Sequence, residues 1–534
     1  METRSSDATV FLNPVPVDQG EHIVQSVPVL GGERVLDAEL RASMAAEYPG
    51  VDAVQAVMVD EAINGLRRQD PLGSASLTFT KAQKWVQIGF FAAVGAAAVT
   101  WPKSVATWTI GILSVVYVVT LMDRLKLFSA GLGSKDMLVI SDEEALAIPD
   151  EDLPVYTIML PAYDEPNVVA QLLAGVGKLN YPRSKLDMQL LLEADDDGTV
   201  NSARNSEAAE LFNIILVPAA EPRTKPKACN YGLLIAKGEI VTIYDAEDVP
   251  DPLQLRRVVA AFRKLPDHIA CIQAKLVFYN DTQNYLTRWF TSEYDQWFGY
   301  ILPGLMAIKA PIPLGGTSNH IKTDVLTTAG GWDPFNVTED CDLGFRLAKN
   351  GYQTAVLDSS TFEEANSDPI NWVRQRSRWY KGYMQTFYVH FRNPLKPFRE
   401  LGFVATLRVI TLSIGLPMLT AINMMFWLLT LTWVLGQPSV MRSFFPSFTY
   451  FAALFSLVIG NASIVYMGLI VAREDKKQQL TFSALASPFY WVLMSMAAIK
   501  AVVQLIFQPS YWEKTFHGLN EEGSVEGVSH EGVQ

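Results

Sequence analysis

The sequence has few basic residues and few cysteines, and these two shortages exclude several classes of function. Lys and Arg number 43 against 56 Asp and Glu, which gives a formal net charge of −13 at pH 7. Because a nucleic-acid-binding surface needs clustered Lys and Arg against phosphates, this balance argues against nucleic acid as a partner. Cys229, Cys271 and Cys341 show no CxxC spacing, so we expect no metal or redox role for them and infer a reducing cytosol.

Charged residues are also scarce, at 19% of the chain against 49% hydrophobic residues, and the scarcity is uneven. The apolar excess is concentrated in residues 85–122 and 403–507, whereas residues 123–402 have the composition of a soluble α/β domain. Since a helix needs ~17–25 apolar residues to cross a bilayer core, the first stretch predicts two spans, at about Trp85–Trp101 and Ser104–Met122.

Basic residues flank this pair of spans on its outer sides. Lys81 and Lys84 precede it, Arg124 and Lys126 follow it, and only Lys103 lies in the turn. By the positive-inside rule both outer flanks are cytoplasmic. The domain that follows is therefore expected in the cytosol.

The C-terminal apolar stretch divides less clearly. Residues 403–435 would form a helix of ~50 Å against ~30 Å of hydrocarbon, which is too long for one upright span and too short for two. We therefore expect an interfacial helix over 403–414 and a span over 417–435, followed by a span over 448–472. Residues 482–507 are interrupted near Pro488 and predict either one more crossing or a re-entrant or interfacial segment, of which we favour the second.

The first residues carry no recognisable chemistry. Residues 1–25 lack the basic start and apolar run of a signal peptide, and residues 34–47 and 51–68 predict two short helices around Pro49-Gly50. The expected organisation is an N-terminal cytosolic extension of unknown role (1–80), two transmembrane helices (81–125), an α/β domain with interfacial helices (126–402), C-terminal transmembrane and interfacial or re-entrant helices (403–515), and an acidic flexible tail (516–534).

Apolar β-type runs alternate with helical patterns in the soluble domain. Strands that alternate with helices predict a parallel sheet, in which ligands bind outside the carboxyl ends of the strands. Because polar or acidic residues follow the runs, we expect a nucleotide pocket at that edge of an α/β, Rossmann-like domain. The runs are Val155–Leu160, Met188–Leu192, Ile214–Val217 and Glu239–Tyr244, with helices expected from Val168 and Val200.

The densest acidic motif follows the fourth run and reads DAED over residues 245–248. Carboxylates this close repel one another unless a cation balances them. Oxygen ligands favour Mg²⁺ or Mn²⁺ bridged to substrate phosphates, so Asp245, Glu247 and Asp248 are candidate metal ligands; the alternative is an acidic turn. Asp195–Asp197 also follow a strand, and they predict either hydrogen bonds to a ribose or base or a solvated acidic turn.

Asp340 lies just before a helical pattern over Asp342–Lys349, with Glu339 beside it. An acid near a helix start can simply cap the helix. A general base in the same place would take the proton from an attacking hydroxyl. The acid cluster upstream and an Arg-rich motif downstream favour the base.

The Arg-rich motif reads QRSRW over residues 375–379, in a helical stretch. Arg376 and Arg378 suit bidentate binding of phosphate oxygens, and the face of Trp379 suits packing on a sugar ring. The alternative is an interfacial helix with basic and aromatic residues against headgroups, and both can hold at once.

Residues 313–320 read PLGGTSNH and predict a small, flexible, polar segment. Its two glycines let the backbone approach a ligand closely. Contact with an acceptor and a plain turn are both compatible with this composition.

The order and spacing of these motifs resemble the processive family 2 glycosyltransferases, the group that contains cellulose and hyaluronan synthases. The resemblance covers about Leu153 to Pro397 with the flanking spans, and it rests on LPAYDE at 160–165, DAED at 245–248, TED at 338–340 and QRSRW at 375–379. It implies a GT-A fold, a UDP-sugar donor and an inverting reaction with a β-linked product. The Asp-x-Asp of the family appears here as Asp245-Ala246-Glu247 with Asp248 next to it, so which acid contacts the metal stays open.

The resemblance also implies roles for individual residues. Asp340, with Glu339 beside it, would be catalytic, and Asp340 would be the base. Trp379, Gly316, Thr317 and Ser318 would contact the acceptor. The nucleotide and donor would be bound by Tyr163, Glu165, Asp195, Asp196, Asp197, Lys227, Asp245, Gln375, Arg376 and Arg378.

These patterns predict a multi-pass hexosyltransferase of the bacterial inner membrane with a cytoplasmic catalytic domain. It would use Mg²⁺ or Mn²⁺, take UDP-sugar as donor, extend a polysaccharide, pass the chain across the bilayer and meet export partners beyond it. The alternative is a non-processive enzyme that puts one sugar on a lipid carrier. Intact acids at every motif argue against an inactive scaffold. The donor sugar, the linkage and the oligomeric state stay open.

Overall fold

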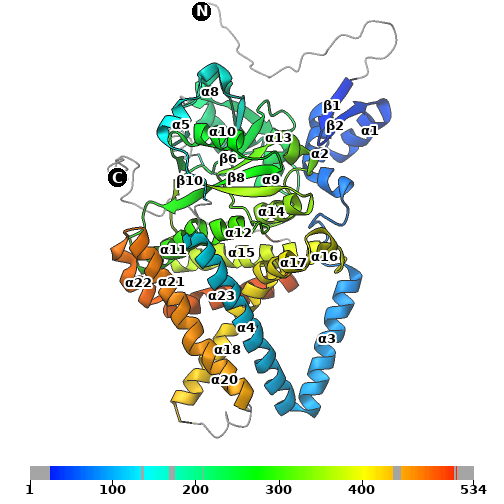
Figure 1. Cartoon of the computed structure of the whole chain (residues 1–534). Helices are drawn as coiled ribbons and strands as arrows, with labels where there is room; N and C mark the ends of the chain where they lie inside the picture. Colours follow the sequence, from blue (N-terminus) through cyan, green and yellow to red (C-terminus); the bar gives the residue numbers. More distant parts are fainter. Residues whose placement is uncertain are drawn as a thin grey trace, which may run out of the picture.

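The computed structural model describes residues 25–133, 137–166, 175–206, 208–436 and 447–509, together with Tyr511 and Glu513. Figure 1 shows a block of sheet and helices with a set of long helices extending from its lower side. The first turns of the helix expected from Val168 and the acidic tail 516–534 lie outside the described residues.

The domain is built on an eight-stranded sheet with the order β5-β4-β3-β6-β9-β8-β10-β7. Strands β5 to β6 of this order are parallel neighbours, which confirms the expected strands and their pairing. Their bounds are β5 (Asn213–Val217), β4 (Leu186–Glu193), β3 (Tyr156–Ala162) and β6 (Ile240–Ile243).

The other half of the sheet is mixed and was not expected. Strand β9 pairs antiparallel with both β6 and β8, β10 runs parallel to β8, and β7 closes the edge. Because β9 includes Asn319 and His320, both buried, the expectation of a flexible segment over 313–320 is wrong at its end. The bounds are β9 (Asn319–Lys322), β8 (Ile269–Phe278), β10 (Gln353–Glu363) and β7 (Val249–Pro250).

Hydrophobic cores lie on both faces of the sheet. One contains Ile158, Leu190 and helix α10 (Gln254–Lys264). The other contains helices α9 (Lys225–Leu233) and α14 (Glu339–Lys349). The remaining helices of the domain are α5 (Asp142–Leu146), α7 (Asp197–Arg204), α8 (Ala208–Leu211), α11 (Tyr285–Gln296), α12 (Leu302–Ala307), α13 (Thr323–Thr328), α15 (Pro369–His390) and α16 (Lys396–Glu400).

The N-terminal residues complete the second core. A hairpin, β1 (Gln25–Val29) and β2 (Gly32–Leu36), leads into α1 (Ala38–Glu47) and α2 (Ala53–Gln69). The helix expected over 34–47 starts later, because residues 32–36 pair with β1 as a strand. Helix α2 packs against α9, and Val57, Val59 and Ile63 are buried with the residues of the sheet. This part is therefore continuous with the core of the domain.

Two helices join the N-terminal part to the rest of the domain. They are α3 (Lys81–Thr100) and α4 (Pro102–Gly133), and they contain the two expected spans. Four helices are long and apolar enough to cross a membrane, by length and composition, within the described residues. Helix α3 is not among them, because Gln83, Lys84 and Gln87 occupy its first turns. The four are Pro102–Leu132, Phe403–Met425, Tyr450–Glu474 and Ser487–Phe507.

The break expected at Gly415–Pro417 does not end a helix. Helix α17 (Phe403–Ile410) continues through a π-helical turn over Thr411–Gly415 into α18 (Leu416–Val434). Pro417 cannot donate a backbone hydrogen bond, and a π turn relieves its clash with the preceding turn. The division into a helix over 403–414 and a separate span from 417 is therefore wrong at the level of secondary structure.

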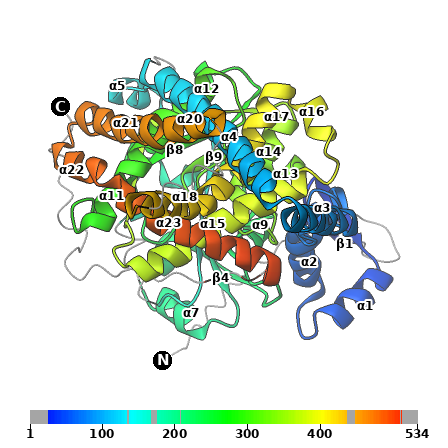
Figure 2. The same cartoon turned by 90° about the horizontal axis from the view of Figure 1, so that it is seen from below.

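The last helices follow the expected boundaries. Helix α20 (Ser447–Phe455) continues through a π turn over Ser456–Gly460 into α21 (Asn461–Glu474), where a span over 448–472 was expected. Helix α22 (Thr481–Leu485) is separated from α23 (Ser487–Phe507) just before Pro488. Helix α23 packs against α15, and Figure 2 shows it in red, lying across the lower face of the domain beside α15.

Candidate active site

The DAED motif forms a tight turn at the carboxyl end of β6. Asp248 is 1% exposed, and its Oδ2 accepts a hydrogen bond of 2.8 Å from the backbone N–H of Asp245 and another from the Thr317 hydroxyl. Burial, and then the neighbouring Asp245, raises the pKa of Asp248. Asp248 therefore braces the turn, whereas the Asp245 side chain is 40% exposed.

Lys225, the first residue of α9, neutralises this turn. Its Nζ forms an ion pair with Asp245 and donates to the Gly316 carbonyl at 2.9 Å. Burial opposes the charge, but Asp245 and Glu339 outweigh burial and raise the pKa of Lys225 above its usual range. Sequence reasoning missed this residue.

Lys227, which was expected near the diphosphate, is not brought to this cluster. Its side chain is 0% exposed, and its Nζ lies 2.7 Å from Glu193 Oε1 and donates to the Ala220 carbonyl at 3.1 Å. Two positions along a helix differ by about 200° in direction, so Lys225 and Lys227 face opposite ways.

Glu339 and Asp340 form the first turn of α14. Asp340 Oδ1 accepts from the Cys341 N–H at 2.7 Å. A Cβ added at Gly316 would lie 3.5 Å from Asp340 Oδ2, which places Gly316 directly beside this carboxylate. Burial, followed by repulsion from Asp340, raises the pKa of Glu339 to about 8, and burial raises that of Asp340 to about 6. Burial thus raises the pKa of both acids of the pair, while the charge of Lys225 acts on each in the opposite direction.

Arg378 of α15 faces the same carboxylates. Burial lowers its pKa, while the charges of Glu339 and Asp245, followed by Asp340, act in the opposite direction. Its Nη1 also donates to the Glu513 carbonyl at 3.2 Å. The site therefore gathers acids from β6 and α14 with one cation from α9 and one from α15.

Arg376 does not face this cluster. Its guanidinium binds both carboxylate oxygens of Glu293, at 2.8 and 2.6 Å, and lies 4.8 Å from the centroid of the Trp379 ring. Trp379 is half-buried beside Phe290 of α11, with ring centroids 6.0 Å apart. Gln375 Oε1 is buried without a hydrogen-bond partner. Arg376 thus anchors α15 to α11 and is not brought to the acid cluster.

A second polar group lies at the ends of β3 and β4. Arg223 donates to the Tyr163 hydroxyl at 3.0 Å and to Asp195 Oδ2 at 2.7 Å. Its guanidinium also lies 5.5 Å from the centroid of the Tyr163 ring. Arg223 was not expected from the sequence, because no motif marks it.

The other acids of this edge lie at the start of α7 or in the turn after β3. Asp196 accepts from the Thr199 N–H at 3.2 Å as a helix cap and from the Asp164 N–H at 2.6 Å. Asp197 is the first residue of α7. The backbone of Glu165 donates to Thr199 Oγ1 at 3.0 Å.

Of the three acceptor residues expected from the glycine-rich segment, Gly316 borders Asp340. The Thr317 hydroxyl also lies 3.0 Å from the Ile243 carbonyl oxygen, and Ser318 donates to Thr361 at 2.7 Å. Thr317 therefore contacts the DAED turn through Asp248, whereas the Ser318 side chain is not brought to the cluster.

Glu363, at the end of β10, adds a carboxylate that the sequence did not reveal. Its Oε1 is buried without a hydrogen-bond partner. Burial, followed by the charges of Asp248 and Glu247, raises its pKa. It was missed because β10 itself was not expected.

The donor set fits a divalent cation that is shared with a substrate. Within the described ranges, no three His, Cys, Asp or Glu side chains are arranged to hold a metal by themselves. Mg²⁺ is commonly bound by one or two carboxylates plus phosphate oxygens. Asp248 is turned inward, and Asp245, whose side chain is 40% exposed, and Glu247 are the other two carboxylates of the DAED turn.

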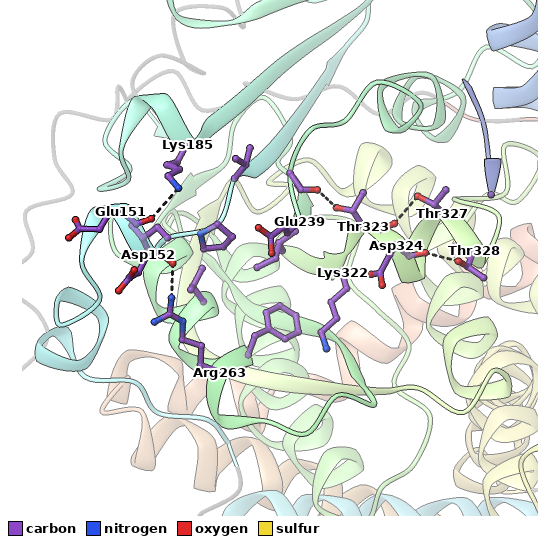
Figure 3. Close-up of a pocket in the computed structure, with 18 residues that line it drawn as sticks. Glu151, Asp152, Lys185, Glu239, Arg263, Lys322, Thr323, Asp324, Thr327 and Thr328 are labelled. Atoms are coloured by element: carbon purple, nitrogen blue, oxygen red, sulfur yellow. Dashed lines mark hydrogen bonds between the residues drawn. The ribbon is translucent and has the colours of Figure 1, made fainter. Parts of the chain in front are cut away.

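A separate hollow of about 1150 Å³ lies at the opposite end of the sheet (Figure 3). Val155, Gly238 and Glu239 line it where β3 and β6 begin. Its cations are engaged locally, since Lys185 donates to the Glu151 carbonyl and Arg263 to the Asp152 carbonyl (Figure 3). Since ligands bind at the carboxyl ends in such sheets, this hollow is not the active site.

Two ranges of the sequence match known protein families. Residues 157–317 match the family described as "Glycosyl transferase family 2", and residues 240–470 match "Glycosyl transferase family group 2". Together the two matches span more than half of the chain. The protein belongs to the family 2 glycosyltransferases. The strand pattern accordingly forms a GT-A fold, and the expected α/β class is confirmed.

This glycosyltransferase has relatives with different products. It is 26% identical over 239 residues to "Probable glycosyltransferase YdaM" of Bacillus subtilis, covering 43% of this chain and 56% of that protein. It is 27% identical over 300 residues to "Probable glucomannan 4-beta-mannosyltransferase 7" of Oryza sativa subsp. japonica, covering 53% and 51%. It is 26% identical over 239 residues to "Beta-monoglucosyldiacylglycerol synthase" of Trichormus variabilis, covering 44% and 50%. The chain spans about half the length of these relatives.

Among solved structures, one similar chain is the mannosyltransferase PcManGT from Pyrobaculum calidifontis in complex with GDP-Man and Mn²⁺. It is 18% identical, with a TM-score of 0.44, and the match covers 74% of this chain and 99% of that one.

Proposed function

We propose that this glycosyltransferase is a processive, inverting polysaccharide synthase of the bacterial inner membrane. It transfers a hexose from UDP-sugar to the end of a β-linked chain and passes the chain across the bilayer. The observation that carries the proposal is the convergence of Asp245, Glu339 and Asp340 with Lys225 and Arg378. The next residue of the same helix, Trp379, turns toward α11.

The donor is held by its nucleotide and its diphosphate. Tyr163, Asp195 and Arg223 form a hydrogen-bonded group suited to the base and ribose. Asp245 and Glu247 would hold Mg²⁺ or Mn²⁺, which would supply positive charge to the diphosphate.

Lys225 and Arg378 add fixed positive charge at the same place. Preorganised cations stabilise the charge that develops on a departing diphosphate without reorganising at the moment of reaction.

Asp340 acts as the general base. It accepts the proton of the acceptor hydroxyl while that oxygen forms a bond to the anomeric carbon, and the bond between that carbon and the diphosphate oxygen breaks on the opposite face. UDP leaves with the bonding electrons, and the configuration at the anomeric carbon inverts. Gly316 lies beside the carboxylate, since a Cβ at this position would be in contact with Asp340 Oδ2 at 3.5 Å.

Processivity is supported by the place of α15 between the acids and the long helices. Helix α15 packs against α23 and against the π turn that leads into α18. A polysaccharide that passes Trp379 on the side of α15 facing α23 and α18 would enter the bundle of apolar helices. With the catalytic domain in the cytosol and these helices in the membrane, the polysaccharide would move outward between them. Export partners beyond the membrane would receive it.

A second candidate is a non-processive transfer of one sugar to a lipid acceptor. The similarity to a beta-monoglucosyldiacylglycerol synthase favours it. The same base and donor site would serve, and the acceptor would come from the bilayer.

The experiment is a donor screen on the purified protein in lipid nanodiscs, with UDP-glucose, UDP-N-acetylglucosamine and GDP-mannose, measuring nucleotide release and product linkage. Asp340→Asn is run beside the wild type. The proposal predicts a UDP-sugar as the best donor and loss of transfer in Asp340→Asn with UDP binding retained. Normal turnover in that variant would overturn the assignment of the base.

A further inference from the structure

Helix α15 meets the loop before α14 along one stripe of side chains. The stripe consists of Gly382, Gln385, Thr386 and His390. Gln385 and Thr386 lie three and four positions after Gly382, and His390 lies four positions after Thr386, so the four share one face of the helix. Arg378 lies four residues before Gly382 and continues the same face. The loop is residues 335–338, which leads directly into Glu339 and Asp340.

The backbones approach most closely at Gly382. A Cβ added there would lie 2.5 Å from Thr338 Oγ1 and 2.8 Å from the Thr338 backbone nitrogen. Real Cβ atoms do not approach this closely, so the packing of α15 against the loop requires glycine here.

Gln385 forms hydrogen bonds to the loop through both the nitrogen and the oxygen of its side-chain amide. The side chain is 0% exposed, its Nε2 donates to the Phe335 carbonyl at 3.1 Å, and its Oε1 accepts from the Val337 N–H at 3.2 Å. Because buried hydrogen-bonding groups are costly to leave unpaired, this pair of bonds fixes the loop in one register along the helix.

Thr386 binds Asn336, the loop residue between Phe335 and Val337. Asn336 Nδ2 donates to Thr386 Oγ1 at 2.9 Å, and Asn336 Oδ1 accepts from the Thr338 N–H at 3.1 Å. The chain of bonds therefore runs from α15 to the residue that precedes Glu339.

The far end of the stripe is fixed to α14 itself. His390 Nε2 lies 2.9 Å from Asp342 Oδ1, and Arg346 Nε lies 2.7 Å from Asp342 Oδ2. Helix α14 is thus tied to α15 both before and after Asp340.

We propose that Gln385 and Thr386 are positioning residues for the transfer reaction, which hold Asp340 in register with Arg378. Gln385 and Arg378 lie on the same helix about two turns apart. The hydrogen bonds of Gln385 to the loop therefore fix the distance between Asp340, which follows the loop, and Arg378, which lies on the helix. This inference rests on the proposed role of Asp340 as the base.

The test compares three replacements in the full-length protein in nanodiscs. Gln385→Met keeps the approximate volume and removes both hydrogen bonds. Thr386→Val removes the hydroxyl at constant shape, and Thr386→Ser retains it. A small misplacement of a catalytic group costs about 10²-fold in rate, so kcat is expected to fall by about that factor in Gln385→Met. Thr386→Val is expected to lose activity that Thr386→Ser keeps, with the donor KM and the UDP affinity unchanged in all three.

Gln189→Met is the matched control. Gln189 is 1% exposed and donates to Asp187 Oδ2 at 3.0 Å on β4. Its replacement removes a buried amide that makes one hydrogen bond through Nε2 and none through Oε1, so it is expected to lower thermal stability and leave kcat per folded enzyme unchanged. An equal loss of kcat in Gln189→Met would show that lost stability explains the effect, and would overturn the proposal.

Asp340→Asn, assayed in parallel, distinguishes the positioning role of Gln385 and Thr386 from the role of Asp340 as the base. If Asp340→Asn is inactive while Gln385→Met and Thr386→Val turn over at the wild-type rate, the positioning role is wrong and the base stands. Normal turnover in Asp340→Asn overturns the base, and the positioning role with it. If Gln385→Met does not fold, the contrast between Thr386→Val and Thr386→Ser decides.

Discussion

Replacing Lys225 by Met is expected to lower kcat about 30-fold while leaving the protein folded. Lys225 pairs with Asp245 and donates to Gly316 at the end of β6, where the departing diphosphate would lie. Two unit charges about 4 Å apart interact by ~4 kcal/mol at an effective dielectric constant of about 20. The Lys225 side chain is 25% exposed and that of its partner Asp245 is 40% exposed, so solvent reaches this end of the site. We therefore reduce the interaction between Lys225 and the departing diphosphate by about half, to about 2 kcal/mol. About 2 kcal/mol on the barrier corresponds to about 30-fold in rate.

Lys227→Met is the contrasting variant, and it is expected to destabilise the fold. It leaves Glu193, 4% exposed, buried without its partner. Breaking a buried pair on one side costs about 3–5 kcal/mol. Burial is the first cause of both the lowered pKa of Lys227 and the raised pKa of Glu193, which favours their neutral forms, so we take the lower end, about 3 kcal/mol.

The assay measures thermal unfolding in detergent and nucleotide release per folded enzyme for both variants, with Lys225→Arg as the charge-preserving control. Lys225→Met should lose rate and, because it leaves Asp245 without its cation, a smaller amount of stability than Lys227→Met. Lys225→Arg should recover most of the rate, and Lys227→Met should lose stability but not rate. The reverse pattern would refute the assignment of Lys225 to the leaving-group side.

Three further outcomes follow from the same geometry. Arg376→Lys should lower the unfolding temperature, because a lysine cannot replace both hydrogen bonds to Glu293, and nucleotide affinity should be retained, as measured by titration with UDP. Arg223→Gln should raise the donor KM several-fold with little change in kcat in steady-state assays, since it removes the bond to Tyr163. Burial raises the pKa of Asp340 to about 6, and the active form is the carboxylate, so kcat/KM should be full above that pH and fall as the pH drops through it. A flat pH profile between pH 5 and 8 would contradict the assignment of the base.

The first half of the sheet could be predicted because its strands are short, continuous apolar runs. Val155–Leu160 and Met188–Leu192 are buried on both faces, and such runs stand out from their surroundings. Strand β9 could not be predicted in this way, because Asn319–Lys322 is mostly polar and becomes a strand only by pairing between β6 and β8. Such long-range pairing leaves no local periodicity.

At the site, the sequence located the right segments but not always the right side chain. Lys225 and Lys227 lie two positions apart on α9, and Arg376 and Arg378 lie two positions apart on α15. Helical geometry turns the members of each pair in nearly opposite directions, so only one of each pair can face the acids. Which one does so depends on how the helix packs against its neighbours. Arg376 has the structural role because it pairs with Glu293, a residue far from it in the sequence.

The most direct test of the central claim is the size of the product at low turnover. Purified protein in nanodiscs is given a limiting amount of the best UDP-sugar per enzyme molecule, and the products are sized by gel and mass spectrometry. Processive synthesis predicts a few long chains beside unused acceptor even when donor is scarce. A uniform population of acceptors carrying one sugar each, with no long chains at any donor concentration, would contradict it.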